Sequence, residues 1–170
     1  HPDNIFLLKG NHELMMRDFL MKENWEEPCG RLWKSNGGVR TLEQMEAFLR
    51  KDCISDRDFH DKRKEFKTWM VEYVNSLPSF LELNVGGQPL VLIHAGINPE
   101  ASLYEQDEEI CAWVREWFYL SPAIKEKTII FGHTPLCYIN SNHQFDVWFD
   151  PVYHDKIGID GGIGPFENGQ

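Results

Sequence analysis

Three apolar stretches of this chain each run into a histidine that lies close to a glycine. They read "LLKGNHE" (7–13), "LIHAG" (92–96) and "FGHT" (131–134). Glycine lets the backbone turn sharply and approach a ligand closely, and sites in layered α/β proteins gather where strands run out into loops. Amide oxygen and imidazole nitrogen suit borderline divalent metals such as manganese, iron and zinc. Asn11, His94 and His133 would together form part of a metal coordination sphere.

Each of these residues also has a plainer interpretation. A single histidine at a strand end is usually a surface or hydrogen-bonded residue, and asparagine beside glycine is usually a turn residue. Glu13 would lie in the first turn of a helix, where an acidic side chain favours the helix dipole. The repetition over three strand ends favours a metal site, but the residues alone leave both interpretations open. The surroundings of His60, His143 and His154 are polar, which indicates surface positions.

The candidate ligands require strands that end close to one another. Apolar and β-branched runs predict a buried strand at 4–8, a β-hairpin over 80–96 that turns at Gly86-Gly87, and a strand over 128–134. We expect two further late strands at 147–150 and 156–160.

Apolar side chains at helical spacing predict four helices around those strands. The helices cover 14–21, 41–50, 55–77 and 107–120, and Pro78 stops the longest of them. Thr41 and Gln44 fit a capping box at the start of the second helix. Because strands alternate with helices and then cluster towards the C-terminus, we expect a layered, mixed α/β fold in a single domain over 1–170.

Composition excludes several classes of protein. The chain has 170 residues, of which 42% are hydrophobic, and this is enough for a substantial core. The formal net charge of −10 and the pI of about 5.1 argue against nucleic acid or an anionic membrane as the main partner. An acidic enzyme can still bind phosphorylated substrates if metal ions supply the local positive charge.

Cysteine spacing and the length of the apolar runs predict a cytoplasmic protein. None of the four cysteines forms a CxxC pair, so neither a structural zinc site nor a disulfide framework is expected. The longest apolar runs are too short to span a bilayer. We therefore expect a soluble protein in a reducing compartment, and the sequence does not indicate its oligomeric state.

The motifs "GNHE" (10–13), "HAG" (94–96) and "GHT" (132–134), in that order, resemble the later motifs of the calcineurin-like metallophosphoesterases. More narrowly, the chain resembles the bacterial and phage-type serine/threonine protein phosphatases. The segments "WKSNGGVRTLEQM" (33–45), "CAWVREWF" (111–118) and "IGIDGG" (157–162) are similar to segments of that branch, so the resemblance covers nearly the whole chain. It implies a layered, mixed β-sheet sandwich with flanking helices.

The resemblance implies metal-dependent hydrolysis of phosphomonoesters, above all of phosphoserine and phosphothreonine in a phosphoprotein or phosphopeptide. Two divalent ions would activate the attacking hydroxide, and Asn11, His94 and His133 would ligate one of them. His12 would be the general acid that protonates the leaving alkoxide, and Arg115 would bind the phosphoryl oxygens. Manganese is the expected metal, although iron, zinc or nickel would also suit these ligands.

The chain departs from the family pattern in one respect. The early motifs "GDxHG" and "GDxxDRG" do not occur in it. These motifs would furnish the Asp and His ligands of the other ion, the bridging Asp, the carboxylate that orients the general-acid histidine and a second phosphate-binding arginine. Because His1 is not a start residue, we expect a C-terminal two-thirds to three-quarters of a longer phosphatase. The chain alone should then be weakly active or inactive, and the strand at 4–8 should have an open edge.

Two other functions remain as alternatives. A dinucleoside tetraphosphate hydrolase of the same superfamily uses the same metals but cleaves a phosphoanhydride, and "WKSNGG" and "WVREWF" favour the protein phosphatase over it. A non-catalytic binding or regulatory module would keep the fold without the chemistry. The missing aspartate motifs are the support for that module in the sequence.

Overall fold

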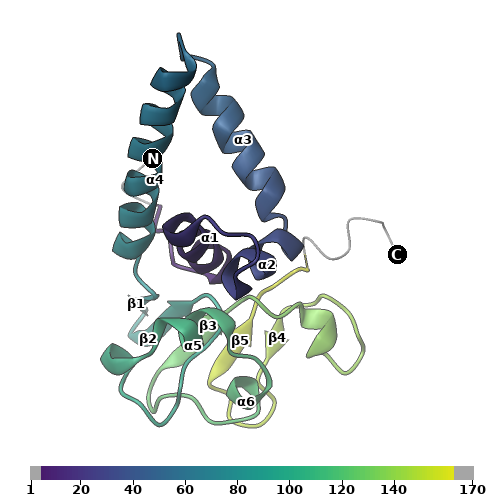
Figure 1. The fold of residues 1–170 in the computed structure, drawn as a ribbon. Coiled ribbons are helices and arrows are strands. Elements are labelled where there is room, and N and C mark those ends of the chain that lie inside the picture. The colour runs from purple at the N-terminus through teal and green to yellow at the C-terminus, as the bar shows by residue number, and fades with distance from the viewer. Residues whose placement is uncertain (1–4, 163–170) are drawn as a thin grey trace. The chain divides into compact units, whose positions relative to one another are not determined.

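The computed structural model describes residues 5–162. In it the chain forms two compact units (Figure 1). One unit is helical and comprises residues 12–77. The other contains the sheet and combines the chain up to Asn11 with the chain from Pro78 onward. The helical unit is therefore inserted between two segments of the sheet unit.

The sheet unit confirms the predicted mixed α/β class. Its five strands lie in the order β1-β2-β3-β5-β4. They are β1 (Phe80–Val85), β2 (Gln88–Ile93), β3 (Thr128–Phe131), β4 (Trp148–Phe149) and β5 (Lys156–Gly158). The pairs β1–β2 and β4–β5 are antiparallel, whereas β2–β3 and β3–β5 are parallel. The strands predicted within 80–96, 128–134, 147–150 and 156–160 are thus present, each shorter than its predicted range.

The predicted hairpin turns at the predicted glycines. Gly86 and Gly87 both have positive φ angles, of 61° and 87°, a combination that favours glycine and suits the tight turns of two-residue hairpin loops. The Asn84 side-chain oxygen accepts a hydrogen bond from the Gly87 N–H at 2.9 Å. This closed turn fixes the register of β1 on β2, in which Val85 lies opposite Gln88.

The sheet has two unlike faces. Alternate residues of β2 and β3 point to a buried face, where Val91, Ile93, Ile129 and Phe131 are at most 4% exposed. They pack against side chains from the segment 95–118, and the Phe118 and Phe131 rings meet edge to face at 5.2 Å. The residues between them, such as Leu92 and Ile130, are apolar as well but only half-buried.

The helix predicted over 107–120 is wrong as a single element. It is broken into α5 (Glu108–Trp113) and α6 (Glu116–Tyr119). Val114 takes an extended ψ of 144°, which ends α5, and α6 then brings Phe118 against Gly96. A Cβ at Gly96 would lie only 2.4 Å from the Phe118 ring. The break between α5 and α6 therefore lets the Phe118 side chain reach the core. The helical spacing of apolar residues over 107–120 does not predict this break.

The strand predicted at 4–8 is also wrong over residues 5–8. Asn4, its first residue, lies outside the described residues. Residues 5–8 have no regular secondary structure and do not pair with the sheet. Ile5, Phe6 and Leu7 are exposed, at 63%, 66% and 55%. An apolar run becomes a strand only when a neighbouring strand satisfies its backbone groups, and none of the five described strands pairs with residues 5–8.

The helical unit contains α1 (Asn11–Lys22), which begins at the last residue of the sheet unit, and then α2 (Pro28–Ser35), α3 (Gly38–Arg50) and α4 (Asp56–Ser76). Three of these helices were predicted, whereas α2 was not, although Pro28 in its first turn was a usable signal. The predicted capping box is wrong, because α3 starts earlier and Thr41 lies inside it, donating to the Gly37 carbonyl. In the described part of the chain no helix has both the length and the apolar character needed to cross a membrane.

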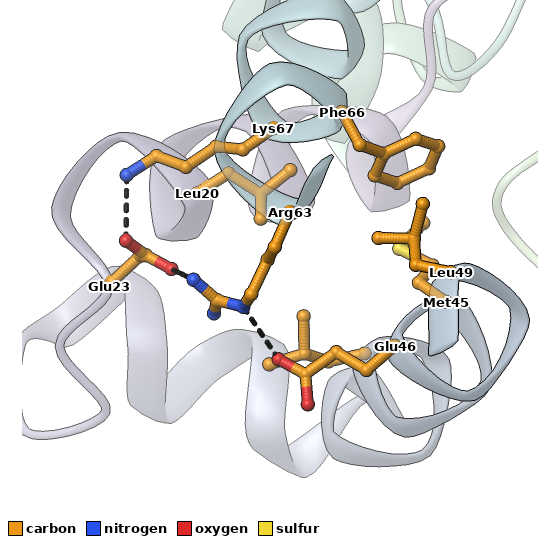
Figure 2. A pocket seen from close by; sticks show the side chains of 9 residues that line it. Leu20, Glu23, Met45, Glu46, Leu49, Arg63, Phe66 and Lys67 are labelled. Atoms are coloured by element: carbon orange, nitrogen blue, oxygen red, sulfur yellow. Dashed lines mark hydrogen bonds and ion pairs between the residues drawn. The ribbon is translucent and has the colours of Figure 1, made fainter. Parts of the chain in front are cut away.

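Helices α1, α3 and α4 surround a small pocket with apolar walls and a charged rim (Figure 2). Arg63 of α4 pairs with Glu23 at 2.6 Å and with Glu46 of α3 at 2.8 Å. Lys67, one turn further along α4, pairs with Glu23 at 2.7 Å. These charges join the three helices, and the apolar residues beneath them, Leu20, Leu42, Met45, Leu49 and Phe66, form the walls.

Candidate metal centre

Asn11 is delivered by the short segment that precedes α1. It is the first residue of that helix and is only 6% exposed. The segment is fixed by a hydrogen bond from the Lys9 N–H to the Pro78 carbonyl at 2.9 Å, where the chain re-enters the sheet unit. A buried amide side chain requires a polar partner. The partner of Asn11 is His94, the residue that follows β2.

His94 and His133 come from the ends of the neighbouring parallel strands β2 and β3. Because Ile93 lies opposite Phe131 in the register, the two chains leave the sheet side by side. The Gly132 N–H donates to the His94 carbonyl at 2.8 Å, which continues the pairing one residue further. His133 then adopts a positive φ of 64°, which turns its side chain out of the strand alternation.

The three predicted ligands converge. The Oδ1 atom of Asn11 lies 2.8 Å from Nε2 of His94, and the same Nε2 lies 3.2 Å from Nδ1 of His133. Asn11 and His94 are 83 residues apart in the sequence, and His94 and His133 are 39 apart. The ring of Trp113 at the end of α5 stands edge-on to His133, with 5.8 Å between the ring centres.

These separations fit donors that share one divalent ion. Ligand atoms sit about 2.0–2.2 Å from such a metal, so neighbouring ligands of one ion lie roughly 3 Å apart. An amide oxygen only accepts hydrogen bonds, and a neutral imidazole has one N–H and one lone pair. Three such atoms at close range are stabilised by a shared proton or by a cation, and an amide with two imidazoles suits a borderline cation. The ligand role of Asn11, His94 and His133 stays a prediction.

One of the three candidate donors is an amide oxygen, that of Asn11, and not a histidine, cysteine or carboxylate. Within residues 5–162, no three His, Cys, Asp or Glu side chains lie close enough together to hold an ion. The cluster therefore consists of two imidazoles and the carbonyl oxygen of Asn11.

Arg115 lies beside the histidine loop because of the break between α5 and α6. Its backbone angles are φ −131° and ψ −112°, outside the helical region, and it precedes α6 as the N-cap. One guanidinium nitrogen, Nη1, donates to the His133 carbonyl at 3.2 Å and to Thr134 Oγ1 at 3.1 Å. The opposite edge of the guanidinium, formed by Nε and Nη2, is the edge that commonly binds two oxygens of an anion.

His12 occupies the first turn of α1 and is exposed. It belongs to the helical unit, so its role as general acid stays a prediction. Glu13 lies in the same turn, where its negative charge complements the helix dipole as expected.

Sequence reasoning missed several residues that surround the donors. Thr134 accepts from Arg115 and is buried. Lys9 is a nearly buried cation just before Asn11, and a charged residue that ends an apolar run was the available signal. Asp160 follows β5, which is parallel to β3, and a Cβ placed on Gly132 would lie 3.9 Å from its Oδ2. Parallel strand pairing thus brings all three strand ends to one edge of the sheet.

Comparison of the chain with models of known protein families gives no match, and comparison with curated proteins gives none either.

Proposed function

We propose that this chain provides the greater part of a metal-dependent phosphomonoester hydrolase that acts on phosphoserine and phosphothreonine in cytoplasmic phosphoproteins. The observation that carries the proposal is the convergence of Asn11 Oδ1, His94 Nε2 and His133 Nδ1 at 2.8 and 3.2 Å. Arg115 supports it, because its guanidinium is anchored on the backbone of His133 itself. An anion-binding group thus lies directly beside the metal donors.

In this proposal each residue has a distinct task. Asn11, His94 and His133 hold one divalent ion, which supplies Lewis acidity for the phosphoryl group when it is bound. Arg115 binds phosphoryl oxygens through its Nε and Nη2 edge, while Nη1 remains on His133 and Thr134. His12 gives a proton to the leaving serine or threonine oxygen, as a general acid within reach of that oxygen does.

The finer fold assignment is part of the same proposal. A calcineurin-like fold is a sandwich of layers, so the sheet should carry apolar side chains on both faces. The described sheet supports this, because Leu92 and Ile130 are apolar and only half-buried on the face opposite the core.

The first test is metal binding by the 170-residue chain. We expect one Mn²⁺ per chain, measured by the loss of the free-ion signal in electron paramagnetic resonance. An Asn11→Ala variant should lose most of this binding, whereas His60→Ala, which changes an exposed histidine of α4, should retain it. Absence of Mn²⁺ binding by the unaltered chain would favour a non-catalytic module and would overturn the proposal.

The second test is turnover by the full-length protein that contains this chain. With Mn²⁺ present, we expect hydrolysis of an aryl phosphate and of a phosphoserine peptide. Diadenosine tetraphosphate is assayed beside them, and a clear preference for it would replace the protein phosphatase assignment with the phosphoanhydride alternative. The isolated chain should show little activity in the same assay, and vigorous turnover by it would contradict the site assignment.

A further inference from the structure

Lys9 is a charged residue buried close to the proposed ligands. Its side chain is only 8% exposed, and its Nζ lies 2.8 Å from Oε2 of Glu108. Removal of an ammonium group from water is unfavourable unless a partner compensates, and Glu108 is that partner for Lys9. Glu108 is the first residue of α5 and lies 99 residues further along the chain. The pair therefore joins the Asn11 segment to α5.

Helix α5 is in turn tied to the strand end that carries His94. The Ala95 N–H donates to the Cys111 carbonyl at 2.8 Å, and Cys111 lies within one helical turn of Glu108. A continuous set of contacts thus runs from Lys9 through Glu108 and α5 to the residue after His94. The set links two of the three donors without passing through either donor side chain.

We propose that the Lys9–Glu108 ion pair positions Asn11 Oδ1 against His94 Nε2 for metal binding. The inference rests on the proposed function only in assuming that these atoms hold an ion. Gly10 separates Lys9 from Asn11, and glycine leaves the backbone many conformations. The anchored lysine restricts that freedom one residue before the donor. Lys9 and Glu108 act through Asn11 and are positioning residues, not ligands.

The alternative is that the pair only stabilises the fold, and a second ion pair of the sheet unit separates the two explanations. Lys127 pairs with Glu82, which joins β1 to the residue before β3. This pair lies at the opposite end of β3 from His133, so its loss should lower stability without moving the donors. Lys127→Met is the matched control for Lys9→Met.

The experiment compares Mn²⁺ affinity and thermal stability in variants of the 170-residue chain. Lys9→Met and Glu108→Gln should each weaken Mn²⁺ binding about 10- to 100-fold, the usual loss when a residue behind the ligands is changed. Lys9→Arg, which keeps the charge, should bind nearly as the unaltered chain does. The double variant should bind no more weakly than the single variants, because both changes remove one interaction. Lys127→Met should lower the melting temperature and leave Mn²⁺ affinity unchanged.

The outcomes separate this inference from the proposed function. If the unaltered chain binds no Mn²⁺, the proposed function fails and takes the positioning role with it. If Asn11→Ala weakens binding while Lys9→Met and Glu108→Gln do not, the ligand set stands and the positioning role alone is wrong. An equal loss of affinity in Lys127→Met would also overturn it. Should Lys9→Met fail to fold, Glu108→Gln provides the test, because the Glu108 side chain is already 36% exposed.

Discussion

At the scale of single residues, the proposed function gives different tasks to two neighbouring residues. Asn11 is buried and directed at His94, whereas His12, the next residue, is exposed. Consecutive residues in the first turn of a helix point about 100° apart, so a ligand and a proton donor can follow one another directly. In the proposed function, the "GNHE" motif therefore supplies both the ligand and the proton donor from one helix start.

This division predicts that the two histidines fail in different ways when they are replaced. His12→Asn in the full-length protein should lower turnover roughly 10²- to 10⁴-fold and leave metal content unchanged, because only the proton donor is lost. His94→Ala should lower metal content itself. Turnover measured beside elemental analysis of the purified protein distinguishes them, and loss of metal in His12→Asn would mean that the roles of Asn11 and His12 are exchanged. His60→Ala is the control for both.

At the scale of elements, ion pairs over the helical pocket link α4 to α3 through Glu46 and to the end of α1 through Glu23 (Figure 2). Burial alone would raise the pKa of Glu23, but hydrogen bonds from Lys67 and Arg63 outweigh it and lower that pKa below its ordinary value. A lowered folded-state pKa means that Glu23 stabilises the fold at pH values above its unfolded pKa. The contribution is lost as the pH falls through the folded value.

Glu23→Gln should therefore destabilise the chain by about 1 kcal/mol at pH 7, since partly exposed pairs contribute little each. The difference from the unaltered chain should shrink as the pH falls below the unfolded-state pKa of about 4.3, and it should vanish once the pH is also below the lower, folded-state pKa. Urea unfolding monitored by far-UV circular dichroism at several pH values measures it. Glu65→Gln, at an exposed position of α4, should change stability little at any pH, and a difference that grew in acid would refute the pairing.

A second prediction concerns β5, whose first residue is a buried lysine. Lys156 Nζ lies 2.7 Å from Asp150 Oδ2 and 2.7 Å from the Ser121 carbonyl, and both side chains of the ion pair are at most 1% exposed. Lys156→Met would leave Asp150 buried without its cation. We expect a loss of about 3–5 kcal/mol, the usual cost of breaking a buried pair.

Chemical denaturation measures this loss, and Lys125→Met is the matched control because Lys125 is exposed. Burial raises the pKa of Asp150, but the hydrogen bond from Lys156 and backbone N–H groups lower it overall. Removal of Lys156 should therefore also reduce the dependence of stability on acid. A loss below about 1 kcal/mol, the level of an exposed pair, would show that the pair is not essential to the sheet.

At the scale of the whole molecule, all three proposed ligands belong to the sheet unit, although the helical unit is inserted directly after Asn11. Mn²⁺ should therefore slow amide hydrogen exchange in peptides that cover 90–97 and 128–136, where β2 and β3 end. Peptides from α3 should exchange at the same rate with and without the ion. Hydrogen exchange with mass spectrometry measures both, and protection centred on α3 would show that the ion binds elsewhere.

The sequence alone determined the features that depend on neighbouring residues. Alternation and helical spacing predicted the hairpin, β3, the late strands and three helices, and the glycine turn at 86–87 followed from backbone sterics. Local signals also misled. An apolar run at 5–8 does not show whether a partner strand exists, and the period of 107–120 does not reveal the break that places Arg115 beside His133.

Only the tertiary structure decided which of these residues meet. The closeness of Asn11 to His94 results from the hydrogen bond between Lys9 and Pro78 and from the antiparallel pairing of β1 with β2, in which Phe80 lies opposite Ile93. The buried pair of Lys9 with Glu108 likewise joins positions 99 residues apart. Such contacts depend on how distant segments pack, and short-range residue patterns carry no information on that packing. The sequence motifs identified the candidate donor residues, whereas the pairing of distant strands placed their side chains close together.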